Sequence, residues 1–491
     1  MTGSTTVDDA EGLAALAEQA LAARCEEAAL PRLQAWLARH PNDATLLHWS
    51  AMLHRALDDR AAAIAALERA RGRAPESAGI AHALAHTTLE AGLPASALFE
   101  RAIMLAPADG SIHLGLGAAR LAEGEGERAL ADLRVMLDAN PGWYDGHRQY
   151  AQLSGLTGRR EAAYETIGRA IERFPDADAL HELAIDLLFE AEDHIGVIDA
   201  VRRAARYCLE TPMLLWSHAV ALDELGRLDE SAPLFARLGP PQDSTQAIRA
   251  VRHSLRTGAL ARAGAELERW LDPAAPELWP YAAIVWRLLE DPRSEWLQGE
   301  PSLVRVVDLP DSALALPRLT ALLRRLHGVS GRFLGQSVRG GTQTDGHLLA
   351  RIDPDVATAR ETLRGEVRRY LDALPRDAAH PTFREPRTAR PRFAGSWSVR
   401  LRETGFHSAH QHPQGRVSSA LYVTVPQAPV GQRGTLELGG APAGLGIDLE
   451  PLVTVEPEPG RLVLFPSWMW HATRRYPAGE RITIAFDIAP A

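Results

Sequence analysis

A proline recurs at nearly fixed intervals in the first part of the chain, and this spacing constrains the fold more than any other feature. Successive prolines are 34, 32, 34 and 34 residues apart and stand at Pro41, Pro75, Pro107, Pro141 and Pro175. Between them, apolar residues recur at helical spacing and short Gly/Asp turns separate the apolar runs. Because proline lacks an N–H and clashes with the preceding turn, each one ends a helix. The pattern predicts one helix pair per interval.

Small residues keep the same phase as these prolines. An alanine stands twelve positions before each proline, at Ala29, Ala63, Ala95, Ala129 and Ala163. Small side chains at a fixed phase let the two helices of a pair approach closely. A helix pair of 34 residues with this pattern resembles the tetratricopeptide repeat, over roughly residues 10–240. We expect a repeat array over residues 10–290, which would form a groove that binds peptides or protein segments; a generic alanine-rich bundle is the alternative.

Composition limits the partners and the compartment. The chain has 491 residues and a formal net charge of −10, so it lacks the excess positive charge that is typical of nucleic-acid-binding proteins. Its two cysteines, Cys25 and Cys208, make neither a disulfide framework nor a thiolate zinc site, and a reducing cytoplasm is the expected compartment. The first residues have no basic start and no apolar run, and no long apolar stretch follows, so neither a secretory signal nor a membrane partner is expected.

The helical phase is lost near Asp291, and short β-type runs follow. We expect residues 1–9 to be disordered, 291–329 to be a connector and 330–491 to form a second domain. Gly/Pro turns separate the β-type runs, which lie at 396–401, 416–426, 434–439, 460–467 and 481–488. Several short strands with such turns fit a sandwich or a barrel, and the residues that they carry favour a jelly roll. The predicted fold is a tetratricopeptide-repeat solenoid followed by a double-stranded β-helix, or jelly roll, with flanking helices.

The stretch GFHSAHQHPQGR, residues 405–416, holds three histidines within six residues. His410 and His412 are two apart, so both rings point to the same side of an extended segment, whereas His407 points elsewhere. A distal histidine, His471, follows the apolar run GRLVLFPSWMW. Histidine is the commonest metal ligand among side chains. We therefore predict a metal site at His410, His412 and His471.

Ten residues after the distal histidine, the run RITIAF carries an arginine and a threonine two positions apart. Arg481 and Thr483 therefore share one face of a strand. An arginine offers a planar fork for a carboxylate, and a threonine hydroxyl can add a hydrogen bond. The two residues are candidates for binding a carboxylate ligand.

A histidine pair, a histidine about sixty residues later and an arginine ten residues further, with a hydroxyl at +2, resemble the Fe(II)/2-oxoglutarate-dependent oxygenases. The resemblance covers about residues 330–491 and is closest to a bacterial group that joins tetratricopeptide repeats to such a domain. The motifs shared with that group lie at Ser337–Thr344, Gly395–Leu401 and Leu462–His471. The resemblance implies a jelly-roll enzyme.

The resemblance also implies cofactors and residue roles. His410 and His471 would hold Fe(II), and Arg481 and Thr483 would bind the distal carboxylate of 2-oxoglutarate. Tyr422, on the strand after the histidine pair, would either touch 2-oxoglutarate or pack in the core. The expected reaction is an O₂-dependent oxidation, usually a hydroxylation, coupled to decarboxylation of 2-oxoglutarate.

The chain departs from the general His-x-Asp motif, because it has His410-Gln411-His412, the His-x-His pattern of the bacterial group that it resembles. A neutral third imidazole would leave an Fe(II) site one charge more positive than a carboxylate would, and would donate less electron density to the iron. Three arrangements stay open. In the first, His412 is the third metal ligand; in the second, His407 replaces His410 or His412 as a ligand. In the third, water is the third ligand and His412 contacts the ligands without binding the metal.

Other residues are candidates for the substrate pocket. The stretch Ser337–Thr344 is either a turn-rich loop without a role or a pocket lid that uses Arg339, Gln343 and Thr344. Trp397 belongs to the pocket wall or the core.

Two other function classes are compatible with the sequence. A cupin-type three-histidine metalloenzyme without 2-oxoglutarate would use the histidines, but no glutamate follows His412 at a suitable distance, and Arg481 would have no role. A non-catalytic repeat scaffold with a degenerate jelly roll is favoured by the His-x-His departure alone.

The sequence therefore predicts a cytoplasmic, bacterial-type dioxygenase that uses Fe(II), 2-oxoglutarate and O₂. Its substrate or partner would be a peptide or protein in the repeat groove, since fold-level analogy links such repeats to protein binding. A further expectation is that removing residues 1–290 weakens substrate binding but leaves Fe(II) and 2-oxoglutarate binding intact.

Overall fold

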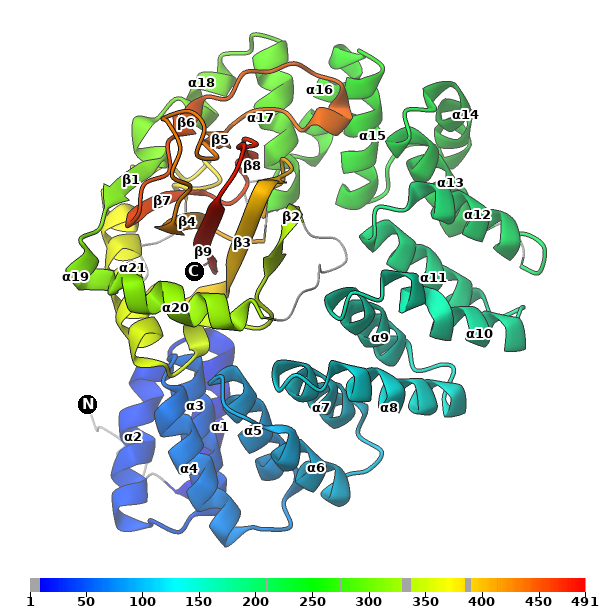
Figure 1. The fold of residues 1–491 in the computed structure, drawn as a ribbon. Coiled ribbons are helices and arrows are strands. Elements are labelled where there is room, and N and C mark those ends of the chain that lie inside the picture. The colour runs from blue at the N-terminus through cyan, green and yellow to red at the C-terminus, as the bar shows by residue number, and fades with distance from the viewer. Residues whose placement is uncertain are drawn as a thin grey trace, which may run out of the picture. The chain divides into compact units, whose positions relative to one another are not determined.

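A computed structural model describes residues 9–208, 211–272, 275–328, 337–384, 390–412 and 414–490 (Figure 1). The predicted disordered segment 1–9 lies outside these residues, apart from Asp9. The chain separates into two compact units, one made of residues 1–135 and 346–357 and the other of residues 136–345 and 358–491. Within the described ranges, no helix is long and apolar enough to cross a membrane.

Helix pairs make up the first unit. The helices are α1 (Ala10–Ala23), α2 (Glu26–Arg39), α3 (Ala44–Ala56), α4 (Arg60–Arg73), α5 (Ala78–Glu90), α6 (Ser96–Leu105) and α7 (Gly110–Ala122), and α8 (Gly126–Ala139) begins there. The side chains of Asp43, Asp59 and Ser77 each cap the helix that follows by accepting a backbone N–H three residues on. Pro41 and Pro75 come directly after the C-caps of α2 and α4, as the proline spacing predicts.

The repeated alanines pack as predicted. Those that stand twelve positions before the prolines are at most 1% exposed; they are Ala29, Ala63, Ala95, Ala129 and Ala163. A larger side chain at these positions would push paired helices apart. The phase of small residues therefore explains why the chain forms tetratricopeptide-type helix pairs, and the predicted solenoid is confirmed.

The second unit continues with helices and then forms the sheets. Its helical segments are α9 (Tyr144–Leu156), η1 (Arg160–Tyr164), α10 (Glu165–Arg173), α11 (Asp178–Glu190), α12 (His194–Ala204), α13 (Pro212–Glu224), α14 (Leu228–Leu238), α15 (Ser244–Arg256), α16 (Leu260–Trp270), η2 (Pro276–Leu278), α17 (Trp279–Leu288), α18 (Arg293–Gln298), η3 (Pro301–Leu303), α19 (Asp311–Leu314), α20 (Leu316–Leu326) and η5 (Ala443–Leu445). Near residue 350, η4 (Leu348–Ala350) and the start of α21 (Pro354–Ala373) belong to the first unit. The predicted connector 291–329 thus contains α18, α19 and α20.

Two antiparallel sheets form the C-terminal part of this unit. The larger has the strand order β1-β7-β4-β9-β3-β2 and the smaller β6-β5-β8. The strands are β1 (Arg305–Asp308), β2 (Val338–Gln343), β3 (Phe393–His407), β4 (Val417–Thr424), β5 (Leu436–Leu438), β6 (Val453–Val455), β7 (Arg461–Pro466), β8 (His471–Thr473) and β9 (Glu480–Ile488). From β4 onward the chain passes repeatedly from one sheet to the other, as in a jelly roll. The predicted jelly roll is confirmed.

Helices α15 to α17 complete the core of these sheets. Val251 of α15 and Ile284 of α17 are buried in the same hydrophobic cluster as Phe465 of β7. The indole Nε1 of Trp470 donates to the carbonyl oxygen of Pro280 at 2.9 Å. The hydrophobic core therefore crosses the predicted boundary at residue 290. A fragment that begins after that residue would expose the apolar face that these helices cover, which revises the expectation that residues 1–290 can be removed without effect on the site.

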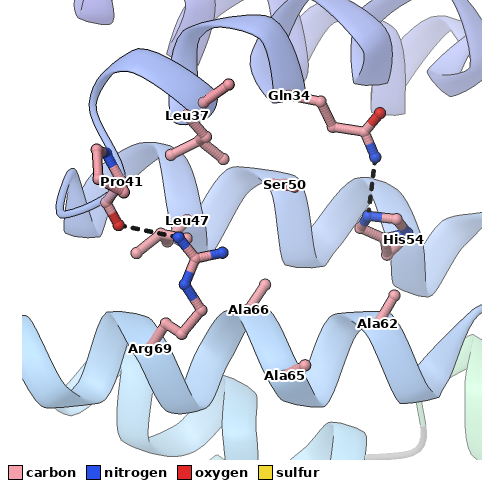
Figure 2. A pocket seen from close by; sticks show the side chains of 11 residues that line it. Gln34, Leu37, Pro41, Leu47, Ser50, His54, Ala62, Ala65, Ala66 and Arg69 are labelled. Carbon is pink, nitrogen blue, oxygen red and sulfur yellow. Dashed lines mark hydrogen bonds between the residues drawn. The ribbon is translucent and has the colours of Figure 1, made fainter.

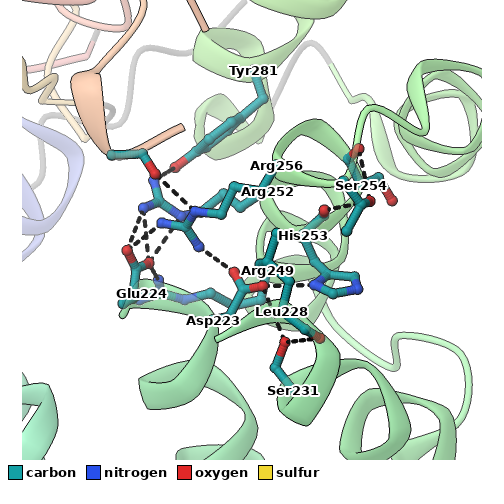
Figure 3. Close-up of polar contacts among 12 residues, drawn as sticks. Asp223, Glu224, Leu228, Ser231, Arg249, Arg252, His253, Ser254, Arg256 and Tyr281 are labelled. Atoms are coloured by element: carbon teal, nitrogen blue, oxygen red, sulfur yellow. Dashed lines mark hydrogen bonds and ion pairs between the residues drawn. The ribbon is translucent and has the colours of Figure 1, made fainter. Parts of the chain in front are cut away.

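An arginine cluster ties the same helices together (Figure 3). Arg249, Arg252 and Arg256 of α15 all pair with Glu224, at the end of α13. Nε of Arg256 donates to the carbonyl oxygen of Gly444 at 2.8 Å, so the cluster reaches the loop between β5 and β6. Charge-assisted hydrogen bonds of this kind are stronger than neutral ones. They attach the last repeat helices to the jelly roll.

Candidate metal and carboxylate site

The backbone around the histidine pair is tied to the start of β8. His410 and His471 exchange two backbone hydrogen bonds, of 3.0 and 2.9 Å. The amide of His412 donates to the carbonyl oxygen of Ser467 at 2.8 Å. One ring nitrogen each of His410, His412 and His471 lies within 4.8 Å of the other two. The structure thus brings the three predicted histidines together, in the one cluster of this kind that the described ranges contain.

Backbone carbonyls determine which nitrogen of His410 and His471 carries the proton. Nδ1 of His410 lies 2.8 Å from the carbonyl oxygen of Ser408, and Nδ1 of His471 lies 3.0 Å from that of Met469. Because a carbonyl oxygen only accepts, each Nδ1 donates, and the lone pair of each ring is on Nε2. These side chains can therefore offer Nε2 to a metal ion.

The third ring faces a carboxylate instead. Nδ1 of His412 donates to Oδ2 of Asp487 at 2.7 Å, and Oδ1 of the same carboxylate accepts from the hydroxyl of Ser418 at 2.6 Å. Histidines that bind metals commonly donate their second N–H to a carboxylate or carbonyl oxygen, which sets the tautomer and the ring orientation. The three rings share this arrangement, so the donor set fits a metal such as Fe(II).

Burial keeps two of these rings in the neutral form that binds metals. Desolvation, together with the neighbouring imidazole of His412, lowers the pKa of His410 to about 3. Desolvation and the neighbouring His410 also hold the pKa of His471 well below its usual value. At neutral pH both lone pairs are therefore available without loss of a proton.

His407 lies next to this group but is not part of it. The hydroxyl of Ser337 is 3.2 Å from Nδ1 of His407 and 3.2 Å from Nε2 of His410, so it links the two rings. Burial holds the pKa of His407 well below its usual value. The geometry thus favours His412 over His407 as the third member of the cluster.

The predicted carboxylate-binding residues lie on the inner face of the large sheet. Arg481 is 3% exposed, and its Nη1 donates to the hydroxyl of Thr473 at 3.1 Å. Its guanidinium lies over the ring of Tyr422, 5.0 Å from the ring centroid. Thr483 is two residues further along β9 and directly opposite Tyr422 of β4. Arg481, Thr483 and Tyr422 therefore lie on the same face of the sheet, and the shared face of Arg481 and Thr483 is the one expected from their spacing.

Buried polar atoms in this region lack a protein partner. Among the described residues, these atoms include Nε of Arg481 and the hydroxyls of Tyr422 and Tyr476. Burial raises the pKa of Tyr422, and it raises that of Tyr476 to about 12, so both hydroxyls keep their protons and can donate. A buried donor without an acceptor costs about 1–3 kcal/mol. An anionic ligand such as a carboxylate would satisfy these donors, so the residues fit the distal end of 2-oxoglutarate.

Residues 395–487 match a family model described as "Putative 2OG-Fe(II) oxygenase". We refer to residues 395–487 as the oxygenase domain, after the description of that model. It contains the three clustered histidines together with Arg481 and Asp487. A search of curated protein sequences found no match to the chain.

Several solved structures are similar to part of the chain outside the oxygenase domain. "Crystal structure of MamA" shares 17% identity, with a TM-score of 0.28, and covers 32% of this chain and 94% of that one. YrrB, titled a TPR protein with an unusual peptide-binding site, shares 21% identity with a TM-score of 0.29, over 35% and 90% of the two chains. A tetratricopeptide repeat protein from Parabacteroides merdae shares 15% identity with a TM-score of 0.31, over 47% and 94%.

Some of the predicted substrate-pocket residues reach the histidine cluster of the oxygenase domain. The ring of Trp397 lies against that of His412, with 5.6 Å between centroids. Nη2 of Arg339 donates to both carboxylate oxygens of Glu192, at 2.8 and 2.5 Å. Arg339 is opposite Phe406 in the β2–β3 ladder, next to the pair of Val338 and His407, and its charge contributes to lowering the pKa of His407.

The other two pocket candidates have different surroundings. The hydroxyl of Thr344 accepts the backbone N–H of Ser398 at 2.9 Å, and the amide of Thr344 donates to the carbonyl oxygen of Ser398 at 3.0 Å. Thr344 therefore fastens the chain after β2 to β3. Gln343 is opposite Val399 at the end of the β2–β3 ladder. A role for either in a pocket stays a prediction.

Gly340 of β2 and Gly405 of β3 allow the two paired strands to approach closely. The register shifts between Arg339 and Gly341, and Gly340 has φ +70°, a conformation that favours glycine. A Cβ at Gly340 would lie 3.0 Å from the Cα of Gly405. The bulge allows this close approach and sets the position of Arg339 beside the cluster.

Sequence reasoning missed Asp487. It lies six residues after Arg481, so the period of two along β9 places both on the inner face. The available signal was an acidic residue at an inward position of an otherwise apolar strand. Ser418, two residues into β4, was also missed, because a serine in a strand carries no such signal.

A hollow of about 490 Å³ lies in the first unit, between α2, α3 and α4 (Figure 2). Its apolar lining includes Leu37 and Leu47, and its polar lining includes His54 and Arg69. Arg69 donates to the carbonyl oxygen of Pro41 at 3.0 Å. This hollow is a candidate contact surface for a protein segment.

Proposed function

We propose that the protein is an Fe(II)- and 2-oxoglutarate-dependent dioxygenase that hydroxylates a peptide or protein side chain bound by its repeats. The observation that carries the proposal is the convergence of one ring nitrogen from each of three histidines, in the same domain as a buried arginine whose Nε has no hydrogen-bond partner among the described residues. A scaffold would gain nothing from leaving such donors buried without a partner, because they destabilise the fold.

The residues divide into two groups. His410, His412 and His471 would bind the metal through Nε2, held in place by acceptors on Nδ1. Arg481, Thr483 and Tyr422 would bind the distal carboxylate of 2-oxoglutarate, with Arg481 supplying the charge. When bound, iron and 2-oxoglutarate supply an O₂-dependent hydroxylation in which 2-oxoglutarate is converted to succinate and CO₂.

The contact between the repeats and β2 supports a protein substrate. Glu192, in the turn between α11 and α12, pairs with Arg339, which lies beside His407. A peptide that follows the repeats past this turn would come next to the histidine cluster. Arg339, Trp397, Gln343 and Thr344 are the proposed pocket residues, and Trp397 already contacts the ring of His412.

An anaerobic Fe(II) titration, with and without 2-oxoglutarate, tests the cofactor site. A keto acid chelated to Fe(II) gives a visible charge-transfer band, which we expect in the wild-type protein. Arg481→Ala should need much more 2-oxoglutarate to give the band, whereas Arg474→Ala should behave as wild type, because Arg474 pairs with Glu437 on the surface.

Two outcomes would favour the alternatives. Tight Fe(II) binding without a band would support a cupin-type metalloenzyme that does not use 2-oxoglutarate. Absence of Fe(II) binding by the folded protein would support a non-catalytic scaffold. For the substrate class, peptides that bind the repeats should raise the rate at which 2-oxoglutarate is converted to succinate; binding without that increase would count against a peptide substrate.

A further inference from the structure

The histidine cluster contains one ring whose second nitrogen faces a charge. Nδ1 of His410 and Nδ1 of His471 donate to backbone carbonyl oxygens, whereas Nδ1 of His412 donates to the carboxylate of Asp487 at 2.7 Å. His412 is also the residue that stands where the family's usual motif has aspartate. The histidine that stands in place of the expected aspartate is therefore hydrogen-bonded to the carboxylate of another aspartate, Asp487.

Serines and a glycine hold this carboxylate in place. Ser418 donates to Oδ1 of Asp487 at 2.6 Å, and its own oxygen lies 3.0 Å from the hydroxyl of Ser467. A Cβ at Gly415 would lie 2.7 Å from the Ser467 hydroxyl and 3.4 Å from Cβ of Asp487. The side chain of Asp487 is 16% exposed, so its orientation is restricted by packing as well as by hydrogen bonds.

The same loop is also attached through its backbone. The amide of His412 donates to the carbonyl oxygen of Ser467, and the amide of Gly415 donates to the carbonyl oxygen of His412 at 2.9 Å. These backbone hydrogen bonds fix the main chain of His412 close to Asp487. The side-chain bond from the imidazole to the carboxylate can therefore set the tautomer and the electron density of the ring.

We propose that Asp487 is a positioning residue for His412, which it holds with Nε2 unprotonated while returning to the site the negative charge that the His-x-His pattern removes. The inference rests on the proposed metal site. A carboxylate behind a histidine raises the basicity of the ligand, and loss of such a partner typically costs 10–100-fold in metal affinity. With this carboxylate behind it, His412 would bring negative charge to the metal site, as an aspartate ligand would.

Two substitutions of Asp487 separate its effect on the tautomer of His412 from the effect of its negative charge. In Asp487→Asn, the amide oxygen can still accept from Nδ1 of His412 and the amide NH₂ can donate to Ser418, so the tautomer is kept and the charge is lost. In Asp487→Leu, both are lost. Asp448→Asn is the matched control, because Asp448 is exposed in the loop between β5 and β6.

The tautomer is measured without any metal. Long-range ¹H–¹⁵N correlation spectra of the metal-free protein, labelled at histidine, report which ring nitrogen is protonated, and His412→Gln identifies the signal. We expect Nδ1–H for His412 in the wild type and in Asp487→Asn, and a mixture in Asp487→Leu. An Nε2–H tautomer in the wild type would overturn the positioning role.

Metal affinity is measured by anaerobic competition between the protein and a chromogenic Fe(II) chelator. Asp487→Asn should bind Fe(II) about 10–100-fold more weakly than the wild type and the control, with the tautomer unchanged. Equal affinity in Asp487→Asn and the wild type would overturn the charge role. A wild type that takes up no Fe(II) would instead overturn the proposed function, and the charge role with it, while the spectra would still decide the tautomer.

Discussion

Asp487 and Arg481 lie on the same inner face of β9, six residues apart along one strand. At about 3.4 Å per residue this separation is about 20 Å of strand. Asp487 holds His412 at one end, and Arg481 reaches Thr473 and the ring of Tyr422 at the other. One strand therefore supplies both the carboxylate behind the histidine cluster and the guanidinium that we propose binds 2-oxoglutarate, with Thr483 between them.

Loss of the Arg481 side chain should weaken the binding of 2-oxoglutarate and leave the binding of the metal unchanged. Removing one partner of a buried, hydrogen-bonded charge pair costs about 2–5 kcal/mol. Arg481→Gln should therefore weaken 2-oxoglutarate binding about 30-fold or more, with Fe(II) affinity within twofold of wild type. Isothermal titration under argon would measure both constants. A parallel loss of Fe(II) binding would show that Arg481 acts on the whole site.

The tyrosine hydroxyls should make a smaller contribution. A single neutral hydrogen bond contributes about 0.5–1.5 kcal/mol. Tyr422→Phe should weaken 2-oxoglutarate binding about 3- to 10-fold, because its hydroxyl is buried without a protein partner beside Arg481. Without ligand, the variant should be as stable as the wild type or more stable, since an unsatisfied group is removed. Thermal denaturation with and without 2-oxoglutarate would separate the two effects.

Stability should depend on pH through His327, at the end of α20. Burial, with the nearby charge of Arg400, lowers its pKa to about 4, while the unfolded chain has the ordinary value near 6.5. Between these values the unfolded state binds more protons, so the native state loses stability as the pH falls from about 6.5 to about 4.

The comparison variant is His327→Asn, which loses the bonds of the ring to Thr342 and Ser398. Urea unfolding at neutral pH should show the variant to be less stable than the wild type. The difference should shrink as the pH falls from about 6.5 toward 4, because only the wild type has this proton to take up on unfolding. Parallel curves in that range would contradict the pKa direction.

The junction of α17 with the sheets should control folding of the oxygenase domain. Residues 291–491 alone should fail to give a cooperative unfolding transition, whereas residues 136–491 should give one, because α15 to α17 share their core with β7. A cooperative transition in the shorter fragment would show that these helices are dispensable.

Within the full chain, Trp470→Phe removes the donor to the Pro280 carbonyl and leaves that oxygen buried. The cost should be about 1–3 kcal/mol, seen as a lower denaturation midpoint with an unchanged fold by circular dichroism. An unchanged midpoint would mean that water replaces the indole N–H.

Features that repeat along the chain could be predicted from the sequence. The alanines around Ala63 and Ala95 mark helix pairs because every repeat places them alike, and they are buried as expected. That His410 and His412 point to one side, and that Arg481 and Thr483 share a face, could be expected because side chains alternate along extended segments. The strands 396–401 and 481–488 were recognised from their β-type runs, and they lie within β3 and β9.

Features that depend on distant contacts could not be predicted. Asp487 acquires its role from a histidine 75 residues away, and the indole of Trp470 bonds to a carbonyl 190 residues away. No local pattern encodes such partners. Strand β2 was missed because VRGGTQ has two glycines, which β-propensity disfavours, and it pairs only with β3, at the edge of its sheet. Strands β6 and β8, of three residues each, were also missed.

Two arginines bind the loop between β5 and β6 through its main-chain carbonyls. Arg256 binds the carbonyl oxygen of Gly444, and Arg287 binds those of Gly439 and Glu450, at 2.5 and 2.8 Å. Every residue type presents the same carbonyl group, so these three bonds do not depend on the side chains of the loop, whereas Leu445 also packs in the hydrophobic cluster of α15 and α17. Adding or deleting one residue would displace at least one of the three oxygens. The exposed positions of this loop should therefore accept many side chains, whereas its length and the buried Leu445 should be restricted.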